Sequence, residues 1–364
     1  MHSLSPRSGA PLTSEADVNQ SQDNGDDLRL RQRLLRPRTL VSFLIGAGIV
    51  ALTVNQLDLN WSEVYTQVTG AHIGLMILAF IANYGSIFVR SVRWRTLLDS
   101  AEVKPDPGYE MPKMRGMAAI YMVSWYFNCL LPAKLGDAYR GYLLKTRSRT
   151  PFSTAFGTVV AERIADVVAL AALLIMSGFL VFGTRIPESL ENWLLLAAVM
   201  GLGLILAFVF AFRYRETLRR LVPERIMPQY LRLEQGMLMS YRNVPSLVLL
   251  TGTIWILEGA RLYAIGLAIG ADLGIPEAVF IALLISLLTA VPATPAGLGF
   301  VEVGIVGAAV VMGFTEDMAA SLAVLDRLVG YWSVIVVGTG VFLLTRWRWR
   351  GKQLASSPGL HSGN

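Results

Sequence analysis

The chain has 364 residues, of which 54% are hydrophobic and only 16% are charged. Its mean hydropathy of +0.50 leaves too little polar surface to cover a water-soluble globule, so the composition excludes a soluble protein and indicates a multi-pass membrane protein. One cysteine and three histidines exclude an internal disulfide and leave no cluster of metal ligands. We therefore expect no metal and no other cofactor.

The N-terminal segment of the chain is polar. Residues 1–27 are rich in Ser, Asp, Asn, Gly and Pro and lack the pattern of a secretory signal peptide, which predicts a disordered cytoplasmic tail. A single all-α transmembrane domain is expected over 28–350, followed by a second disordered cytoplasmic tail over 351–364. Full spans, each of about 20 apolar helical residues, are predicted in six places: 39–57, 73–92, 151–182, 193–212, 244–270 and 318–346.

Basic residues mark one side of the predicted bundle. Five segments at the ends of the spans are rich in Lys and Arg: 28–38 contains 5 of these residues, 90–115 contains 6, 132–149 contains 5, 213–242 contains 7 and 346–352 contains 4. The segments at the opposite ends of the spans contain a single basic residue, Arg185. Because cytoplasmic loops carry the excess of Lys and Arg, both termini are predicted to be cytoplasmic in a protein of the cell (inner) membrane.

Two apolar regions are interrupted by Pro and Gly and do not fit as single spans. Region 114–147 has basic residues at both flanks, so we expect a re-entrant hairpin that enters from the cytoplasm and turns near "LLPAKLGD", where Pro132 and Gly136 break the helix. Region 276–313 lacks basic flanks, which favours a hairpin from the outer side. Two complete crossings would satisfy its charges equally well. Its expected turn residues are Pro292, Pro295, Gly297 and Gly299.

The two halves of the chain share an order of motifs. "LLPAKLGDAYRG" (130–141) is followed, about 26 residues after its Gly136, by "ERI", and "AVPATPAGLGFVEVG" (290–304) is followed at a similar distance by "DRL". The predicted orientation of the two units is opposite, so they form an inverted repeat of the kind that builds many secondary transporters. The alternative is coincidence, because Pro-Ala and Gly are common in membrane helices.

Charged residues inside the predicted membrane domain are the candidate site. An Arg or Asp at the centre of a bilayer helix costs roughly 2.5–3.5 kcal/mol, so such residues usually line a polar cavity or pair with one another. The arginines suit a phosphate, and the carboxylates could match an amine or carry a proton. Pairs that only hold helices together are the alternative. The predicted substrate-binding and translocation residues are Asp137, Arg140, Glu162, Arg163, Asp166, Glu258, Arg261, Glu302, Asp326 and Arg327.

Three runs, "NCLLPAKLGDAYRGYLL", "AERIADVVAL" and "AVPATPAGLGFVEVG", resemble the integral-membrane domain of the lysylphosphatidylglycerol synthase and flippase family over about residues 40–345. The resemblance implies movement of polar-headed lipids, such as aminoacylated phosphatidylglycerol, between leaflets; other relatives are linked to polyprenyl-phosphate sugars or hopanoid pathways. Bifunctional members add a large aminoacyl-transferase domain, so lysyl transfer is not expected here. The family's motif positions fall on Pro132, Gly136, Asp137, Arg140, Glu162, Arg163, Asp166, Pro292, Gly297, Gly299 and Glu302.

These features favour a flippase-like protein for a (phospho)lipid or a polyprenyl-phosphate lipid. No "GxxxxGK[ST]" loop occurs, so ATP is not expected to drive it directly. The expected partners are the lipid substrate, anionic lipids at the cytoplasmic face and a separate lipid-synthesis enzyme, with no nucleic acid. The alternatives are a membrane transferase with a lipid-linked donor and Asp58 or Glu63 as its catalytic carboxylate, and a scaffold of a lipid-synthesis complex.

Overall fold

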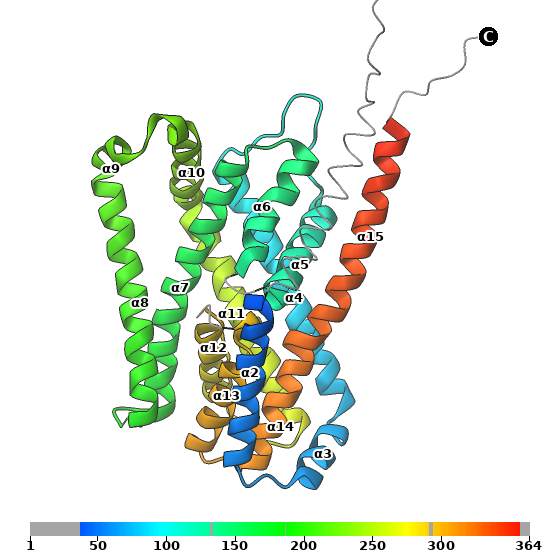
Figure 1. The fold of residues 1–364 in the computed structure, drawn as a ribbon. Coiled ribbons are helices and arrows are strands. Elements are labelled where there is room, and N and C mark those ends of the chain that lie inside the picture. Colours follow the sequence, from blue (N-terminus) through cyan, green and yellow to red (C-terminus); the bar gives the residue numbers. More distant parts are fainter. Residues whose placement is uncertain (1–36, 132–133, 186, 291–293, 357–364) are drawn as a thin grey trace, which may run out of the picture.

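The computed structural model describes residues 37–131, 134–185, 187–290 and 294–356, and every regular element in these ranges is a helix (Figure 1). The predicted all-α class is therefore confirmed. The α-helices are α2 (Pro37–Gln56), α3 (Trp61–Thr69), α4 (Ile73–Ser100), α5 (Met114–Leu130), α6 (Leu135–Ser148), α7 (Phe152–Phe182), α8 (Glu188–Arg213), α9 (Arg215–Leu221), α10 (Met227–Met239), α11 (Val244–Ala268), α12 (Ile275–Ala290), α13 (Phe300–Val311), α14 (Glu316–Arg327) and α15 (Ser333–Ser356).

Five helical stretches in the described ranges are long and apolar enough to cross a membrane: Ile73–Ser100, Phe152–Phe182, Leu190–Arg213, Glu224–Ala268 and Glu316–Arg346. They coincide with five of the six predicted spans. The sixth prediction, 39–57, falls on α2, whose apolar part is the shorter stretch Leu44–Gln56. The predicted tail 1–27 lies outside the described residues, whereas α15 continues to Ser356 and so enters the segment 351–364 that was predicted as a tail.

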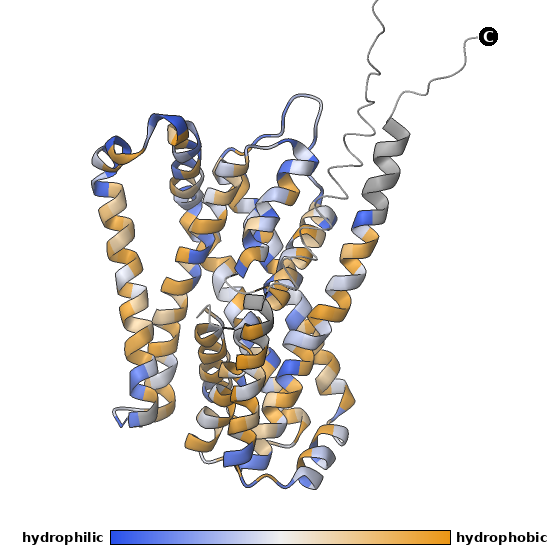
Figure 2. Cartoon of the chain, in the orientation of Figure 1, coloured by the Kyte–Doolittle hydropathy of each residue, from blue (hydrophilic) through white to orange (hydrophobic). Residues whose placement is uncertain are grey.

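The helices turn at two ends of the bundle, which we call the α9 end and the α3 end (Figure 1). The α9 end also holds the start of α5 and the end of α6, and the α3 end holds the turns that follow α11 and α13. Hydrophobic residues cover the shaft of α8, and hydrophilic residues gather at its two ends (Figure 2). This distribution is the one expected of a helix whose middle lies in hydrocarbon.

Two helical hairpins enter the bundle from opposite ends. Helices α5 and α6 lie in the half towards the α9 end, and α12 and α13 lie in the half towards the α3 end (Figure 1). The helices of each hairpin pack against each other, and the tip of the second one, the short helix η4 (Pro295–Gly297), packs against α5. The two tips therefore meet inside the bundle, where long helices α4 and α11 also pack together.

The first tip turns within the predicted run "LLPAKLGD", but Gly136 has a different role from the one expected. Gly136 is the second residue of α6 rather than part of the turn, and its carbonyl accepts a hydrogen bond from Ser124 Oγ at 2.8 Å. A Cβ atom at Gly136 would overlap the Ser124 carbonyl oxygen, so this glycine permits the close approach of α5 and α6. The turn itself includes Lys134, whose backbone is left-handed with φ 51° and ψ 40°. The predicted turn residue Pro132 lies outside the described residues.

The second tip follows its prediction more closely. Pro295 opens η4, and Gly297 and Gly299 have left-handed φ values of 67° and 88°, which suit glycine. Gly299 is also the residue before α13, where its backbone N–H donates to the Glu302 carboxylate at 2.7 Å. Pro292 lies outside the described residues.

Replacing Gly136 by alanine should destabilise the first hairpin, because the new methyl group meets the Ser124 carbonyl; overpacking of this kind costs about 1–3 kcal/mol. The matched control is Gly203→Ala in α8, where a Cβ meets nothing within 4 Å and helix propensity favours alanine. Thermal unfolding in detergent should show a lower midpoint for Gly136→Ala than for Gly203→Ala. Equal midpoints would show that α5 and α6 are farther apart than described.

Candidate functional site

A cavity of about 170 Å³ lies between the two hairpin tips and the long helices around them. The first hairpin contributes Trp125 and Asn128, and the second contributes Ser286 and Thr289. Since a water molecule needs at least about 10–15 Å³ of such space, the cavity has room for on the order of ten waters or for a small headgroup. Its wall belongs to both halves of the chain.

Charged side chains make up much of the cavity wall. Within the described part of the chain, five basic and three acidic residues line it: Arg90, Lys134, Arg163, Arg261, Arg327, Asp166, Glu258 and Asp326. Six of these were predicted as site residues. The other four predicted residues, Asp137, Arg140, Glu162 and Glu302, do not line the cavity, but each forms an ion pair: the three carboxylates pair with arginines, and Arg140 pairs with Glu162.

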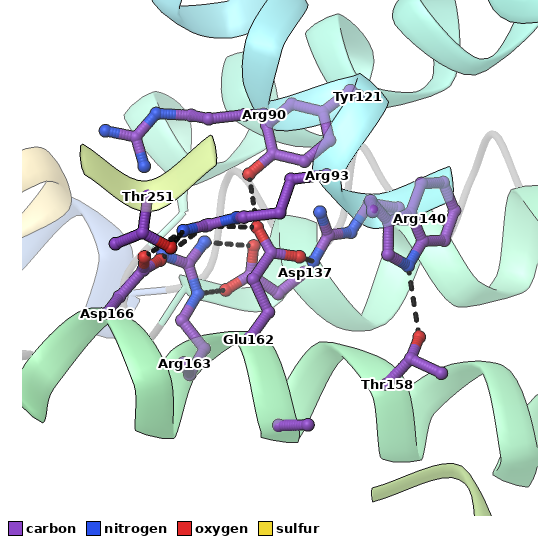
Figure 3. Close-up of polar contacts among 12 residues, drawn as sticks. Arg90, Arg93, Tyr121, Asp137, Arg140, Thr158, Glu162, Arg163, Asp166 and Thr251 are labelled. Atoms are coloured by element: carbon purple, nitrogen blue, oxygen red, sulfur yellow. Dashed lines mark hydrogen bonds and ion pairs between the residues drawn. The ribbon is translucent and has the colours of Figure 1, made fainter. Parts of the chain in front are cut away.

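A first ionic network centres on Arg93 of α4, whose side chain is fully buried (Figure 3). Its guanidinium donates to both oxygens of Asp166, at 2.6 and 3.0 Å, and to Glu162 at 2.9 Å. Glu162 is itself fully buried, because Arg140 lies 2.9 Å away and the Tyr121 hydroxyl donates to it at 2.9 Å. Glu162 therefore acts behind the cavity wall rather than on its surface.

The same network extends to the first hairpin through Arg163 of α7. Its guanidinium donates two hydrogen bonds to Asp137 of α6, at 2.7 and 2.8 Å, a bidentate geometry typical of strong Arg–carboxylate pairs. Arg163 also lies 3.7 Å from Asp166, the i, i+3 pairing expected from the sequence. The Asn128 side-chain amide donates to Asp137 at 3.0 Å. Three arginines and three carboxylates thus form one neutral group across α4, α6 and α7.

A second network joins α4, α11 and α14. Arg90 donates to Glu258 at 3.1 Å, and Arg261 lies 3.3 Å from Glu258 and 3.2 Å from Asp326. The Arg90 guanidinium also lies over the Trp125 ring, 4.8 Å from its centroid. Two arginines and two carboxylates are again balanced, so this group is neutral as well.

A third ion pair fixes the second hairpin tip to α14. Arg327 lies 2.8 Å from Glu302 and donates to the backbone carbonyls of Ala296 and Gly297, at 3.4 and 3.3 Å. It corresponds to the pair Asp137–Arg163: in both hairpins a carboxylate near the start of the second helix binds an arginine 25 or 26 residues later, on the next long helix.

The sequence did not identify Arg90 and Arg93 as site residues. Both fall in segment 90–115, whose basic residues were assigned to a cytoplasmic loop, but α4 continues to Ser100 and buries both side chains. A signal for them did exist. The predicted site held four arginines and six carboxylates, and a buried cluster with two unbalanced negative charges requires two more cations.

Comparison with known proteins agrees with this architecture. A family model described as the lysylphosphatidylglycerol synthase TM region matches residues 39–338. The chain belongs to this family. The resemblance inferred from the three sequence motifs is therefore confirmed, and the protein is an integral multi-pass membrane protein.

Three relatives of this family member come from archaea. A UPF0104 membrane protein of Methanocaldococcus jannaschii is 34% identical over 220 residues, covering 60% of this chain and 94% of the relative. A UPF0104 membrane protein of Methanothermobacter thermautotrophicus is 24% identical over 325 residues, 82% of this chain and 93% of the relative. The glycosyltransferase AglD of Haloferax volcanii is 26% identical over 176 residues, 48% of this chain but only 26% of the relative.

Arg93→Met should strongly destabilise this protein, because Glu162 and Asp166 would keep buried charge without its main partner; breaking a buried pair in this way costs about 3–5 kcal/mol. The control is Arg95→Met on the same helix, whose half-exposed pair with Asp99 contributes about 1 kcal/mol or less. Reversible unfolding in mixed micelles measures both.

The double variant Arg93→Met/Asp166→Asn restores neutrality and should recover part of the loss. If Arg93→Met costs no more than Arg95→Met, the first network does not hold the bundle together.

Proposed function

We propose that this protein is a flippase-like transporter that moves a polar-headed phospholipid or polyprenyl-phosphate lipid between leaflets. The headgroup occupies the cavity, and the acyl or prenyl tails stay in the surrounding lipid. The observation that carries the proposal is the cavity itself, which is lined by eight charged side chains, lies inside an apolar bundle and is bounded by the tips of two hairpins from opposite ends. A site that serves two leaflets must open to each leaflet in turn, and a hairpin from each end of the bundle could control one of these openings.

The proposed topology has six full spans and two re-entrant hairpins in the cell (inner) membrane, with the α9 end and both termini in the cytoplasm. The basic segments at that end support this orientation through the positive-inside rule. The proposed inverted repeat comprises α4 to α7 and α11 to α15. Its support is the matching pair of ionic contacts, Asp137–Arg163 and Glu302–Arg327, in hairpins of opposite orientation.

These two contacts suggest how a headgroup opens the cavity. Arg163 and Arg327 line the cavity and also tie a hairpin to the next long helix. An anionic headgroup that binds either arginine competes with its carboxylate partner and weakens that tie. Because a ligand shifts a conformational equilibrium only by its differential affinity, the direction of opening depends on which arginine the headgroup binds.

Further proposals concern the energy source and the partners. Lipid movement follows a concentration gradient or is coupled to protons through carboxylates that reach the cavity, such as Asp166, whereas Glu162 is sealed behind the wall. The exposed basic helix α9 (Arg215–Leu221) is suited to anionic lipid at the cytoplasmic face. A separate lipid-synthesis enzyme would supply or consume the transported lipid.

A membrane transferase with a lipid-linked donor is the second candidate, and it is favoured by the relative whose name is glycosyltransferase AglD. The similarity covers a quarter of that protein, so the activity in its name need not reside in the shared part. The carboxylates suggested for catalysis, Asp58 and Glu63, do not line the cavity. The Asp58 backbone N–H instead donates to Glu316, at 2.9 Å.

The test is to fill the cavity without changing its charge. Ser286→Phe places a ring against the second hairpin's wall, and Val336→Phe adds similar bulk to an outward-facing position of α15. In proteoliposomes with fluorescent phosphatidylglycerol, Ser286→Phe should slow transfer between leaflets at least about tenfold, equivalent to about 1.4 kcal/mol in the barrier, and Val336→Phe should not.

Equal transfer by wild type and Ser286→Phe would argue against the cavity as the route. Mass spectrometry of the same vesicles with an added lipid-linked sugar addresses the second candidate, because a new lipid product would favour the transferase.

A further inference from the structure

The ionic groups around the cavity leave one charge unbalanced. The three networks are neutral: three arginines with three carboxylates, two with two and one with one. Four of the five basic residues that line the cavity have a carboxylate within 4.0 Å. The fifth, Lys134, has no ion-pair partner in the described part of the chain.

Lys134 stands at an unusual position for its residue type. It directly precedes α6 at the tip of the first hairpin, and its φ of 51° and ψ of 40° are left-handed. The second hairpin carries nearly the same sequence at its tip: "PAKLG" at 132–136 corresponds to "PAGLG" at 295–299. Lys134 therefore replaces the residue that corresponds to Gly297, whose φ is 67°. Glycine adopts this conformation without strain and lysine does not, which indicates that the ammonium group has a use there.

The other polar groups of the cavity favour a negative ligand over a cationic one. All three carboxylates that line the cavity already have an arginine partner, so none offers an unbalanced negative charge to a ligand amine. Most of the buried polar atoms without a partner on the cavity residues are donors; the acceptors among them are Asn128 Oδ1 and Asp326 Oδ1. Trp255 Nε1, Arg90 Nε and Arg261 Nε are buried and have no hydrogen-bond partner among the described residues. All three side chains line the cavity with Lys134.

We propose that the cavity selects a headgroup of net negative charge, a phosphate mono- or diester without a balancing amine, and that Lys134 supplies its counter-charge. This inference rests on the proposed function and narrows its substrate class. A zwitterionic headgroup brings an amine for which the cavity has no carboxylate without an arginine partner. An aminoacylated, net-positive headgroup fits still less well, because it would add charge to a wall that is already positive.

Native mass spectrometry of the purified full chain in detergent tests this proposal. The probes are phosphatidylglycerol and phosphatidylethanolamine with identical acyl chains, and inorganic phosphate is a competitor. Lys134→Met removes the positive charge, and Lys134→Gly removes the charge and also the strain of the left-handed backbone. Lys145→Met is the matched control on an exposed position of α6. A melting curve of each variant confirms that it is folded.

We expect wild type to bind phosphatidylglycerol at least about tenfold more tightly than phosphatidylethanolamine. Both Lys134 variants should lose about tenfold in affinity for phosphatidylglycerol while their affinity for phosphatidylethanolamine stays within about twofold; Lys145→Met should match wild type. Because Lys134→Gly carries the residue of the second tip, we expect it to fold even if Lys134→Met does not.

The contrary results are distinct. Full preference for phosphatidylglycerol in Lys134→Gly, or equal binding of both lipids by wild type, would overturn the inference and leave lipid transport intact. Wild type that binds neither lipid would overturn the proposed function. Displacement of phosphatidylglycerol by millimolar phosphate would support the anion chemistry but identify a soluble anion, rather than a lipid, as the ligand.

Discussion

The structure depends on the neutralisation of charge inside an apolar bundle. Arg90 and Arg93, one turn apart on α4, point into two different networks, one with α11 and α14 and the other with α6 and α7. Between helices that lie in lipid the hydrophobic effect contributes little, so polar contacts and close packing must fix the arrangement. The ionic contacts extend from the first hairpin through α4 to α14, and Arg327 of α14 binds the second hairpin. Helix α4 is therefore the link between the two halves.

This constraint also explains why the cavity can hold a ligand. Arginines that are fully paired cost less to bury than free ones, so the wall stays in place without a ligand. The same arginines keep donor atoms that their carboxylates do not use, as at Arg90 Nε and Arg261 Nε. One group of residues thus stabilises the bundle and offers hydrogen bonds to an incoming anion. In this arrangement the same residues can join the helices to one another and bind a substrate.

Much of the fold could be predicted from sequence because it follows from lengths of apolar helix and from Pro and Gly. The hairpins begin and end within one or two residues of the predicted regions 114–147 and 276–313. The errors have physical causes. The positive-inside rule cannot distinguish a buried arginine from a loop arginine, which hid Arg90 and Arg93. Gly136 looked like a turn residue because its neighbour Ser124 could not be known. The burial of Glu162 likewise depends on three side chains from other helices, Arg93, Arg140 and Tyr121.

The central claim is that the two tips enclose one hydrated cavity, and thiol labelling tests it most directly. In a Cys129→Ala background, single cysteines are placed at Asn128 of the first hairpin and Ser286 of the second, both on the cavity wall. A third, at Val336, faces outward. A charged, membrane-impermeant thiol reagent should label the cysteines at 128 and 286 in membrane vesicles but not the one at 336. Labelling of neither cavity position would contradict the account, because a dry contact between the tips could not admit a headgroup.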